Sequence, residues 1–147
     1  MQDIAPEIVS IADACLGGLR GRAALLIGPE EQRRPYADLL RQEKIKSLYE
    51  EDTPERIAYL LPYVQLLISL PAVQHTVLNV STAEQHTLPL TAASIAKGCI
   101  GRNKPLLILD LVPSSSVEEL AGLLPAVCLY TPADLRIMLA KAEAKAS

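Results

Sequence analysis

The residues best suited to chemistry in this sequence stand at the ends of short apolar runs. Gly28 closes the run of residues 23–27, and Arg33 and Arg34 follow in a charged stretch. A glycine at such a position makes the tight turn of a diphosphate-binding loop, and guanidinium groups bind phosphate oxygens through paired hydrogen bonds. Gly28, Arg33 and Arg34 therefore indicate a phosphate-binding turn.

The same stretch also has features that oppose phosphate binding. A turn of the G-x-G-x-x-G type uses three glycines, and only Gly28 is present here. Pro29 lacks a backbone donor, and a carboxylate of Glu30 or Glu31 at ~4 Å from a phosphate would cost about 4 kcal/mol at a protein surface. We therefore favour a solvated charged loop over a phosphate site, with the next helix beginning at Pro35.

Acidic side chains follow the next apolar run at a spacing typical of nucleotide sites. Glu50 and Asp52 lie just over 20 residues after Gly28, where an acid accepts the ribose hydroxyls of NAD in dinucleotide-binding folds. With Glu51 they form a group of three carboxylates, which would repel the extra phosphate of NADP. NAD is therefore favoured over NADP if a nicotinamide cofactor binds. The alternative is that Asp52 or Thr53 only caps the following helix.

Two further polar residues stand in candidate buried strands. Ser69 ends the run of residues 64–69, and Asp110 belongs to residues 106–112, the most strand-like run of the chain. The carboxyl ends of parallel strands are where α/β sheets bind ligands. Ser69 and Asp110 are therefore candidates for contact with a cofactor. For Asp110, hydrogen bonds from neighbouring loop amides are an equally open interpretation.

Histidines and cysteines give weaker signals. His75 and His86 have no second ligand or base at motif spacing, which favours loop histidines over catalytic or metal-binding ones. The three cysteines, Cys15, Cys99 and Cys128, are widely spaced and odd in number, so they indicate neither a disulfide framework nor a zinc site. We expect them to be small buried apolar residues. No catalytic residue and no metal ligand is assigned.

The elements that must position these residues alternate between short apolar runs and segments with helical spacing. Strands are expected at residues 23–28, 45–49, 64–69, 106–112 and 126–130, and helices at residues 4–16, 35–42, 54–61, 91–99 and 132–144. This alternation predicts an α/β fold, a Rossmann-like doubly wound parallel sheet of about five strands with helices on both faces. For residues 70–87 the sequence leaves two alternatives open, a further strand near residues 76–80 or a loop throughout.

Composition supports the same class and excludes others. With 147 residues the chain suits one domain, residues 1–147, with a leading helix in 1–18 and a closing helix in 132–147 whose end frays. Half of the residues are hydrophobic without any Trp or Phe, which indicates an aliphatic core. The net charge of −3 argues against general nucleic-acid binding. No signal peptide or apolar span of ~20 residues is found, so we expect a cytoplasmic protein that binds no membrane.

Two stretches together resemble a known family. Near the start, a helix leads through GLRGR (residues 18–22) into a strand ending in Ile-Gly. Near the end, KPLLILDLVP (residues 104–113) is followed by LPAVCLYTPADL (residues 124–135). This pattern is similar to the cofactor domain of glutamyl-tRNA reductase over roughly residues 4 to 140, and more distantly to shikimate dehydrogenases. The resemblance implies a Rossmann-like NAD(P)-binding domain.

The chain also departs from the family pattern. Ser114 stands where the family has an Arg after the closing Pro, and the acids before Thr53 replace a leading Asn-Arg. His75 falls near the segment that lies beside the nicotinamide in the family, and that segment begins here at Ser69. These differences indicate a divergent relative.

The resemblance covers only the cofactor domain. The family's catalytic N-terminal domain, tRNA-binding surface and C-terminal dimerisation domain have no counterpart in the matched residues. We therefore expect a stand-alone, non-catalytic accessory or regulatory protein linked to tetrapyrrole biosynthesis, with no certain cofactor. One alternative is an NAD-binding subunit of an oxidoreductase whose catalytic part is on another chain. The other is a ligand-free interaction module that forms a homodimer or binds another protein subunit, with residues 132–146 or residues 59–73 as the interface.

Overall fold

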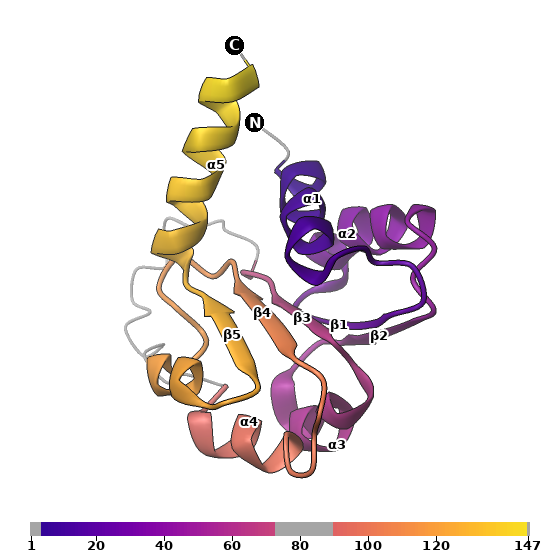
Figure 1. The fold of residues 1–147 in the computed structure, drawn as a ribbon, viewed down its shortest axis with the longest axis vertical. Helices are drawn as coiled ribbons and strands as arrows, with labels where there is room; N and C mark the ends of the chain where they lie inside the picture. Colours follow the sequence, from indigo (N-terminus) through magenta and orange to yellow (C-terminus); the bar gives the residue numbers. More distant parts are fainter. Residues whose placement is uncertain (1–3, 73–89, 147) are drawn as a thin grey trace.

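The computed structural model describes residues 4–72 and 90–146, and its centre is a parallel sheet of five strands (Figure 1). The strands are β1 (Ala23–Ile27), β2 (Ser47–Glu51), β3 (Leu66–Ser69), β4 (Leu106–Asp110) and β5 (Val127–Tyr130). They lie in the order β2-β1-β3-β4-β5, and each neighbouring pair is parallel. The predicted α/β fold is confirmed.

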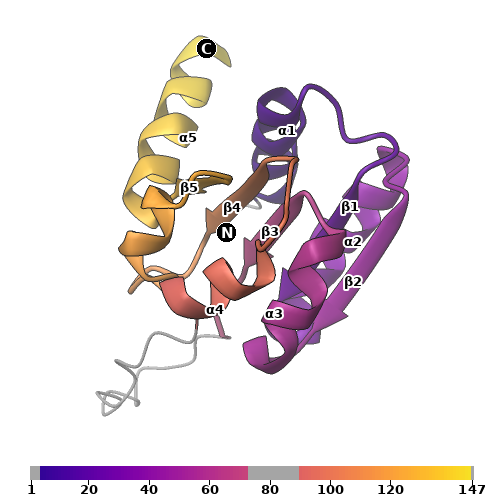
Figure 2. The ribbon, with the colours of Figure 1, turned by 60° about the horizontal axis from the view of Figure 1, so that its bottom comes forward.

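Helices cover both faces of the sheet, as Figure 2 shows. One face packs against α1 (Ala5–Leu16), α2 (Glu30–Gln42) and α5 (Pro132–Ala146). The other face packs against α3 (Ile57–Leu60), α4 (Ala92–Gly98) and the short 3-10 helices η2 (Leu61–Tyr63) and η4 (Glu119–Leu123). A further 3-10 helix, η1 (Pro54–Arg56), leads into α3. The sheet is therefore doubly wound, as predicted.

Alternating residues of the strands supply the two cores. In β1, Ala24 and Leu26 join the core under α1 and α2, whereas Leu25 and Ile27 join the opposite one. Successive side chains of a strand point to opposite faces, so a strand covered on both sides must be apolar throughout. All residues of β1, β3 and β4 are buried, whereas the edge strand β2 is half-buried along its length.

Helix α2 begins at Glu30, directly after the first strand, so the predicted charged loop and the predicted helix start at Pro35 are wrong. Pro29 occupies the N-cap position with an extended backbone (φ −62°, ψ 146°). Glu30 and Glu31 lie in the first turn, where carboxylates interact favourably with the helix N-terminus. Pro35 lies inside the helix, where a proline costs about 3 kcal/mol.

Smaller differences from the predicted elements occur at their ends. β2 begins at Ser47, two residues later than predicted, and α5 continues as a helix to Ala146 instead of fraying. Thr53 precedes η1 at the N-cap position but makes no side-chain cap, because this segment starts as a 3-10 turn. Thr91 in contrast caps α4, since its side chain accepts a backbone hydrogen bond from the first turn.

The cysteines differ from the prediction of buried apolar residues. Cys15 and Cys128 are exposed, and Cys99 is half-buried. Cys15 lies beside the buried stripe of α1, and Cys128 lies on the edge strand β5, so neither reaches a core. The Cys15 thiol and the Tyr130 hydroxyl are hydrogen-bonded over 3.7 Å. This hydrogen bond, with a further contribution from the charge of Cys128, raises the pKa of Tyr130 to about 12.

Some predictions concern segments beyond the described residues. His75, His86 and the expected strand near residues 76–80 all lie outside residues 4–72 and 90–146. Within those two ranges, no helix combines the length and the apolar character needed to cross a bilayer.

Candidate functional site

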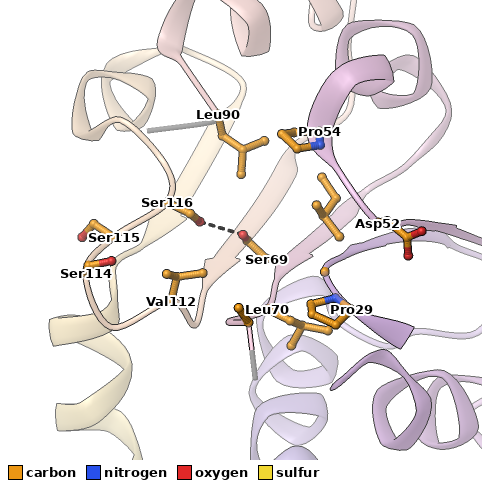
Figure 3. A pocket seen from close by; sticks show the side chains of 13 residues that line it. Pro29, Asp52, Pro54, Ser69, Leu70, Leu90, Val112, Ser114, Ser115 and Ser116 are labelled. Atoms are coloured by element: carbon orange, nitrogen blue, oxygen red, sulfur yellow. Dashed lines mark hydrogen bonds between the residues drawn. The ribbon is translucent and has the colours of Figure 1, made fainter. Parts of the chain in front are cut away.

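The carboxyl edge of the sheet is hollowed where the strand order reverses, between β1 and β3. Doubly wound sheets bind their ligands at this switch point. The pocket has a volume of about 360 Å³, at the lower end of the range for small-molecule sites. Figure 3 shows its walls, which come from the segments that follow β1, β2 and β3 and from the loop after β4.

The predicted site residues lie at different distances from this pocket. Three of them line it: Gly28, Asp52 and Ser69. Asp110 lies behind its wall and is joined to it through Ser116. Three do not belong to the lining: Arg33, Arg34 and Glu50. The structure thus gathers the predicted residues at one edge of the sheet but brings only some of them to the cavity.

Gly28 is required by the close approach of two chain segments. Its N–H donates to the Glu51 carbonyl at 2.9 Å, and its φ of 145° is a conformation that side chains rarely adopt. A Cβ at this position would lie 2.9 Å from the Leu70 Cβ and 3.0 Å from the Leu70 carbonyl oxygen. Packing between the end of β1 and the residue after β3 is therefore sufficient to explain this glycine.

The turn between β1 and α2 has the length of a dinucleotide turn but different side chains. Counted from Gly28, the second and third glycine positions of G-x-G-x-x-G are Glu30 and Arg33. The second glycine lets the backbone approach a pyrophosphate, and the third lets helix and strand pack closely. Here a carboxylate stands on the first residue of α2 and a guanidinium on the fourth.

The Arg33 side chain is held by three groups of the protein itself. Its Nε donates to the Gly28 carbonyl at 2.8 Å, its Nη1 to Glu50 at 2.8 Å and its Nη2 to Asp52 at 2.7 Å. The side chain is only 11% exposed. Arg33 therefore joins the start of α2 to the end of β2, and three of its five N–H donors are already hydrogen-bonded to the protein.

Every acid at the end of β2 has an arginine partner. Glu50 also contacts Arg41 at 3.3 Å, and Glu51 accepts two hydrogen bonds from Arg56, at 2.8 and 3.2 Å. The hydrogen bonds from Arg56 lower the pKa of Glu51, although burial of the carboxylate opposes this shift. The group of acids that the sequence places together is thus neutralised by neighbouring guanidinium groups.

Arg34 is the less constrained of the two predicted phosphate ligands. Its Nη2 lies 3.4 Å from a carboxylate oxygen of Glu30, one turn earlier in α2, and the two side chains are 64% and 72% exposed. An exposed pair of this kind adds little stability. Arg34 therefore stays a candidate ligand on the helix surface, away from the pocket lining.

Asp110 is buried and hydrogen-bonded by the loop that follows it. Its Oδ1 accepts from the Val112 N–H at 3.1 Å and from the Ser116 hydroxyl at 2.8 Å. Its Oδ2 accepts from the N–H groups of Ser116 at 2.9 Å and Val117 at 3.0 Å. Four donors compensate the loss of hydration of this carboxylate. The predicted hydrogen bonds to loop amides are present, and contact with a ligand stays a prediction.

Ser69 extends this network to the pocket. Its Oγ lies 2.6 Å from the Ser116 Oγ, as drawn in Figure 3. Because the Ser116 hydroxyl donates its single proton to Asp110, the Ser69 hydroxyl donates to Ser116. The remaining lone pairs of Ser69 can then accept a hydrogen bond at the pocket wall.

Sequence reasoning missed Ser116 and Leu70. A run of serines at residues 114–116, soon after an acid that ends a strand, is a usable signal, because a serine offers that acid both an amide and a hydroxyl donor. Leu70 offers no such signal, because it matters only through its close contact with the Gly28 backbone. Among residues 4–72 and 90–146, no group of three or more His, Cys, Asp or Glu side chains could hold a metal ion.

No family model matches the chain, but known proteins are similar to it in sequence. A glutamyl-tRNA reductase from Methanospirillum hungatei is 29% identical over an alignment of 147 positions that covers 90% of this chain. Another from Alkalilimnicola ehrlichii is 30% identical over an alignment of 149 positions that covers 94% of this chain. The chain is similar to one part of glutamyl-tRNA reductase. It spans about a third of these relatives, 34% and 32% of their lengths.

The fold agrees with this relationship. A solved structure of glutamyl-tRNA reductase from Methanopyrus kandleri matches 92% of this chain with a TM-score of 0.71, at 17% sequence identity. The matched part is 36% of that reductase chain. The resemblance to a glutamyl-tRNA reductase domain and the Rossmann-like α/β fold are therefore both confirmed.

Proposed function

We propose that this chain is a non-catalytic accessory domain whose first β–α turn has replaced dinucleotide binding by an internal ion pair. The observation that carries the proposal is the Arg33 side chain, which stands at the third glycine position and bonds to Gly28, Glu50 and Asp52. Such a domain acts by binding another protein rather than by converting a substrate.

Two physical effects at this turn oppose a dinucleotide. The Glu30 carboxylate stands where a glycine backbone would approach the pyrophosphate, and repulsion at ~4 Å costs about 4 kcal/mol at a protein surface. Glu50 and Asp52, the acids that would accept the ribose hydroxyls, already accept charge-assisted hydrogen bonds from Arg33 at 2.8 and 2.7 Å. A ribose would have to share these carboxylates with Arg33.

Thermal unfolding with NAD, NADH, NADP and NADPH tests the proposal. A cofactor at about 1 mM with a dissociation constant of about 1 µM would stabilise the fold by about 4 kcal/mol. In a domain of this size that gain raises Tm by roughly 10 °C or more. We expect no shift with any of the four, and a shift of that size with one of them would refute the proposal.

A variant with restored glycines tests whether the turn itself prevents binding. Replacing Glu30→Gly and Arg33→Gly together removes the carboxylate from the second glycine position and frees the acids after β2. We expect the double variant to gain NAD affinity, measured by calorimetry. Arg34→Gly is the matched control, because this exposed residue of the same helix contacts none of the acids after β2.

The switch-point pocket favours a second candidate function, an NAD-binding component of an oxidoreductase whose catalytic part is on another chain. Its volume of about 360 Å³ admits a small ligand, and Asp52 and Ser69 line it. Asp52 in this position would select NAD over NADP. Saturable NAD binding that Ser69→Ala weakens about tenfold, as the loss of a hydrogen bond to a ligand, would favour this candidate over the first.

Helix α5 favours a third candidate, an interaction module that forms a homodimer. Figure 1 shows α5 extending beyond the sheet, and Ile137 on this helix is 58% exposed. Sedimentation over a range of concentrations would detect a dimer, and Ile137→Glu should abolish it by burying a charge in the interface. A monomer at all concentrations would remove this candidate.

We also propose that the chain serves tetrapyrrole biosynthesis in the cytoplasm. The support is its similarity to glutamyl-tRNA reductase over nine tenths of its length. The proposal predicts that deleting the gene impairs growth and that a supplied tetrapyrrole precursor corrects the defect. Growth that is unaffected by the deletion, or is not restored by the precursor, would contradict this link.

A further inference from the structure

The amino edge of the sheet, opposite the switch-point pocket, is rich in positive charge. Its loops are residues 17–22, 43–46, 61–65, 99–105 and 124–126. They contain one acid, Glu43, and six cations: Arg20, Arg22, Lys44, Lys46, Arg102 and Lys104. Among the described residues, no carboxylate lies within 4.0 Å of any of these six.

A second pocket lies at this edge, between the loops that precede β3 and β4. It has a volume of about 190 Å³. The polar side chains that line it are two cations and two amides: Arg102, Lys104, Gln65 and Asn103. No acidic residue belongs to the lining. The pocket therefore presents hydrogen-bond donors and positive charge without a counterion of its own.

Backbone carbonyls hold the Arg102 side chain in this pocket. Its Nε donates to the Lys104 carbonyl at 2.6 Å and its Nη1 to the Leu61 carbonyl at 2.8 Å, and its Nη2 donates to the carbonyls of Val64 and Pro105. An arginine has five N–H groups, so these four bonds leave one free on Nη1. The carbonyls fix the guanidinium in place but do not neutralise it, and burial lowers the pKa of Arg102.

The neighbouring side chains add donors at the same place. The Gln65 Oε1 accepts from the Ala23 N–H at 2.9 Å, so the side-chain NH₂ of Gln65 is the group left for a ligand. Lys104 and Asn103 are exposed and can turn toward a bound ion at little cost in packing. The pocket thus combines one fixed cation, one adaptable cation and two amides.

We propose that this amino-edge pocket binds a phosphate group, either as the free ion or as part of a small phosphomonoester. A guanidinium and an ammonium together suit a dianion with several acceptor oxygens, because each bond to a charged oxygen is stronger than a neutral one. The amides of Gln65 and Asn103 supply further donors for the remaining oxygens. The other cations of the edge draw anions toward the pocket through their summed field. The site is independent of the proposed function, because it lies at the opposite edge of the sheet.

Amide proton–nitrogen correlation spectra during a titration with inorganic phosphate test this site. Sodium chloride keeps the ionic strength constant. We expect saturable shifts at Gly98, Gly101 and Arg102, whose residues line the pocket. A parallel titration with glycerol phosphate distinguishes the free phosphate ion from a phosphomonoester. Binding of inorganic phosphate alone identifies a site for the free ion, and binding of both compounds identifies a site that also accepts an ester. Absence of saturable shifts in both titrations overturns the proposal.

Two lysine variants distinguish specific phosphate binding in the pocket from general attraction of anions to a basic surface. Lys104→Ala should raise the dissociation constant about tenfold, through loss of one charge-assisted hydrogen bond. Lys46→Ala should change it less than about twofold, because the start of β2 lies three strand spacings, about 14 Å, from the start of β4. That separation exceeds the Debye length of about 10 Å at 0.1 M salt. Equal weakening by the two variants would overturn the proposal.

Discussion

The two edges of the sheet treat positive charge in opposite ways. Near the carboxyl edge and along β2, four arginines lie within 4.0 Å of carboxylates: Arg33, Arg34, Arg41 and Arg56. At the amino edge, the six cations of the loops have no carboxylate within this distance among the described residues. The edge at which a doubly wound sheet binds nucleotides is thus the one whose charges are satisfied internally.

The architecture of the fold and the contacts of its first turn depend on different residues. The strand order, the switch point and Gly28 remain, because they depend on core packing and on the approach of Leu70. The hydrogen-bonding groups of the turn are instead occupied by Arg33 and its partners. Protein side chains then hold positions that a ligand would otherwise need.

The largest effect is expected at the glycine that joins β1 to the pocket. Gly28→Ala places a Cβ 2.9 Å from the Leu70 Cβ at a φ of 145°, and should lower the free energy of unfolding by about 3 kcal/mol. Gly21→Ala is the control, since its φ is 80° with no atom within 4 Å of the added Cβ, and should cost about 1 kcal/mol. Urea denaturation measures both, and equal losses would contradict the role of Leu70.

The buried carboxylate after β4 gives the next largest effect. Asp110→Asn turns an NH₂ group toward donors of the loop, among them the N–H groups of Ser116 and Val117. We expect a loss of about 2 to 3 kcal/mol, because a buried donor is left without an acceptor. Ser69→Ala removes a single hydrogen bond of the same network and should cost about 1 kcal/mol. Denaturant midpoints that do not separate the two variants would contradict this network.

Arg33 and Arg34 provide a comparison within one helix. Arg33 is 11% exposed and bonds to two acids, so Arg33→Ala should lower the free energy of unfolding by about 1.5 kcal/mol. Arg34 is 64% exposed, and Arg34→Ala should cost less than about 0.5 kcal/mol. Thermal unfolding of the two variants in one buffer measures the difference. A larger loss of stability for Arg34→Ala than for Arg33→Ala would contradict the stabilising role of the Arg33 ion pairs.

The pH dependence at Glu51 is the smallest expected effect. Hydrogen bonds from Arg56 hold the folded pKa of Glu51 below the ordinary value of 4.5. The stabilisation by this pair is therefore fully present above pH 4.5 and is lost as the pH falls through the lower folded pKa. Arg56→Ala should bring the carboxyl titration back toward 4.5, which carbon-detected NMR can follow. An unchanged titration would show that the pair does not form in solution.

The fold was predictable from the sequence because the strands are buried on both faces. The runs at β1, β3 and β4 are apolar at nearly every position, and that pattern is specific to covered parallel strands. Helix starts were less predictable. Pro35 is a favoured first residue of a helix, yet α2 starts five residues earlier, with two acids in its first turn and with Arg33 bonded to the Gly28 carbonyl and to Glu50.

The candidate site was predictable only as a set of residues near one edge. Parallel topology gathers Gly28, Ser69 and Asp110 at the strand ends, and their spacing in the sequence is enough to infer this. The pairing of Arg33 with Glu50 and Asp52 was not predictable, because it depends on which way α2 projects its side chains over β2. The partners of Asp110 were not predictable either, because they depend on the path of the loop after β4.

The turn after β1 holds an internal ion pair where dinucleotide-binding folds seat a pyrophosphate. Amide proton–nitrogen correlation spectra recorded during a titration with NAD test it most directly at Gly28, Glu30 and Arg33. We predict that these signals, including the Arg33 Nε–H, stay in place at millimolar NAD. Saturable shifts of these signals, with loss of the Arg33 Nε–H protection, would contradict the account.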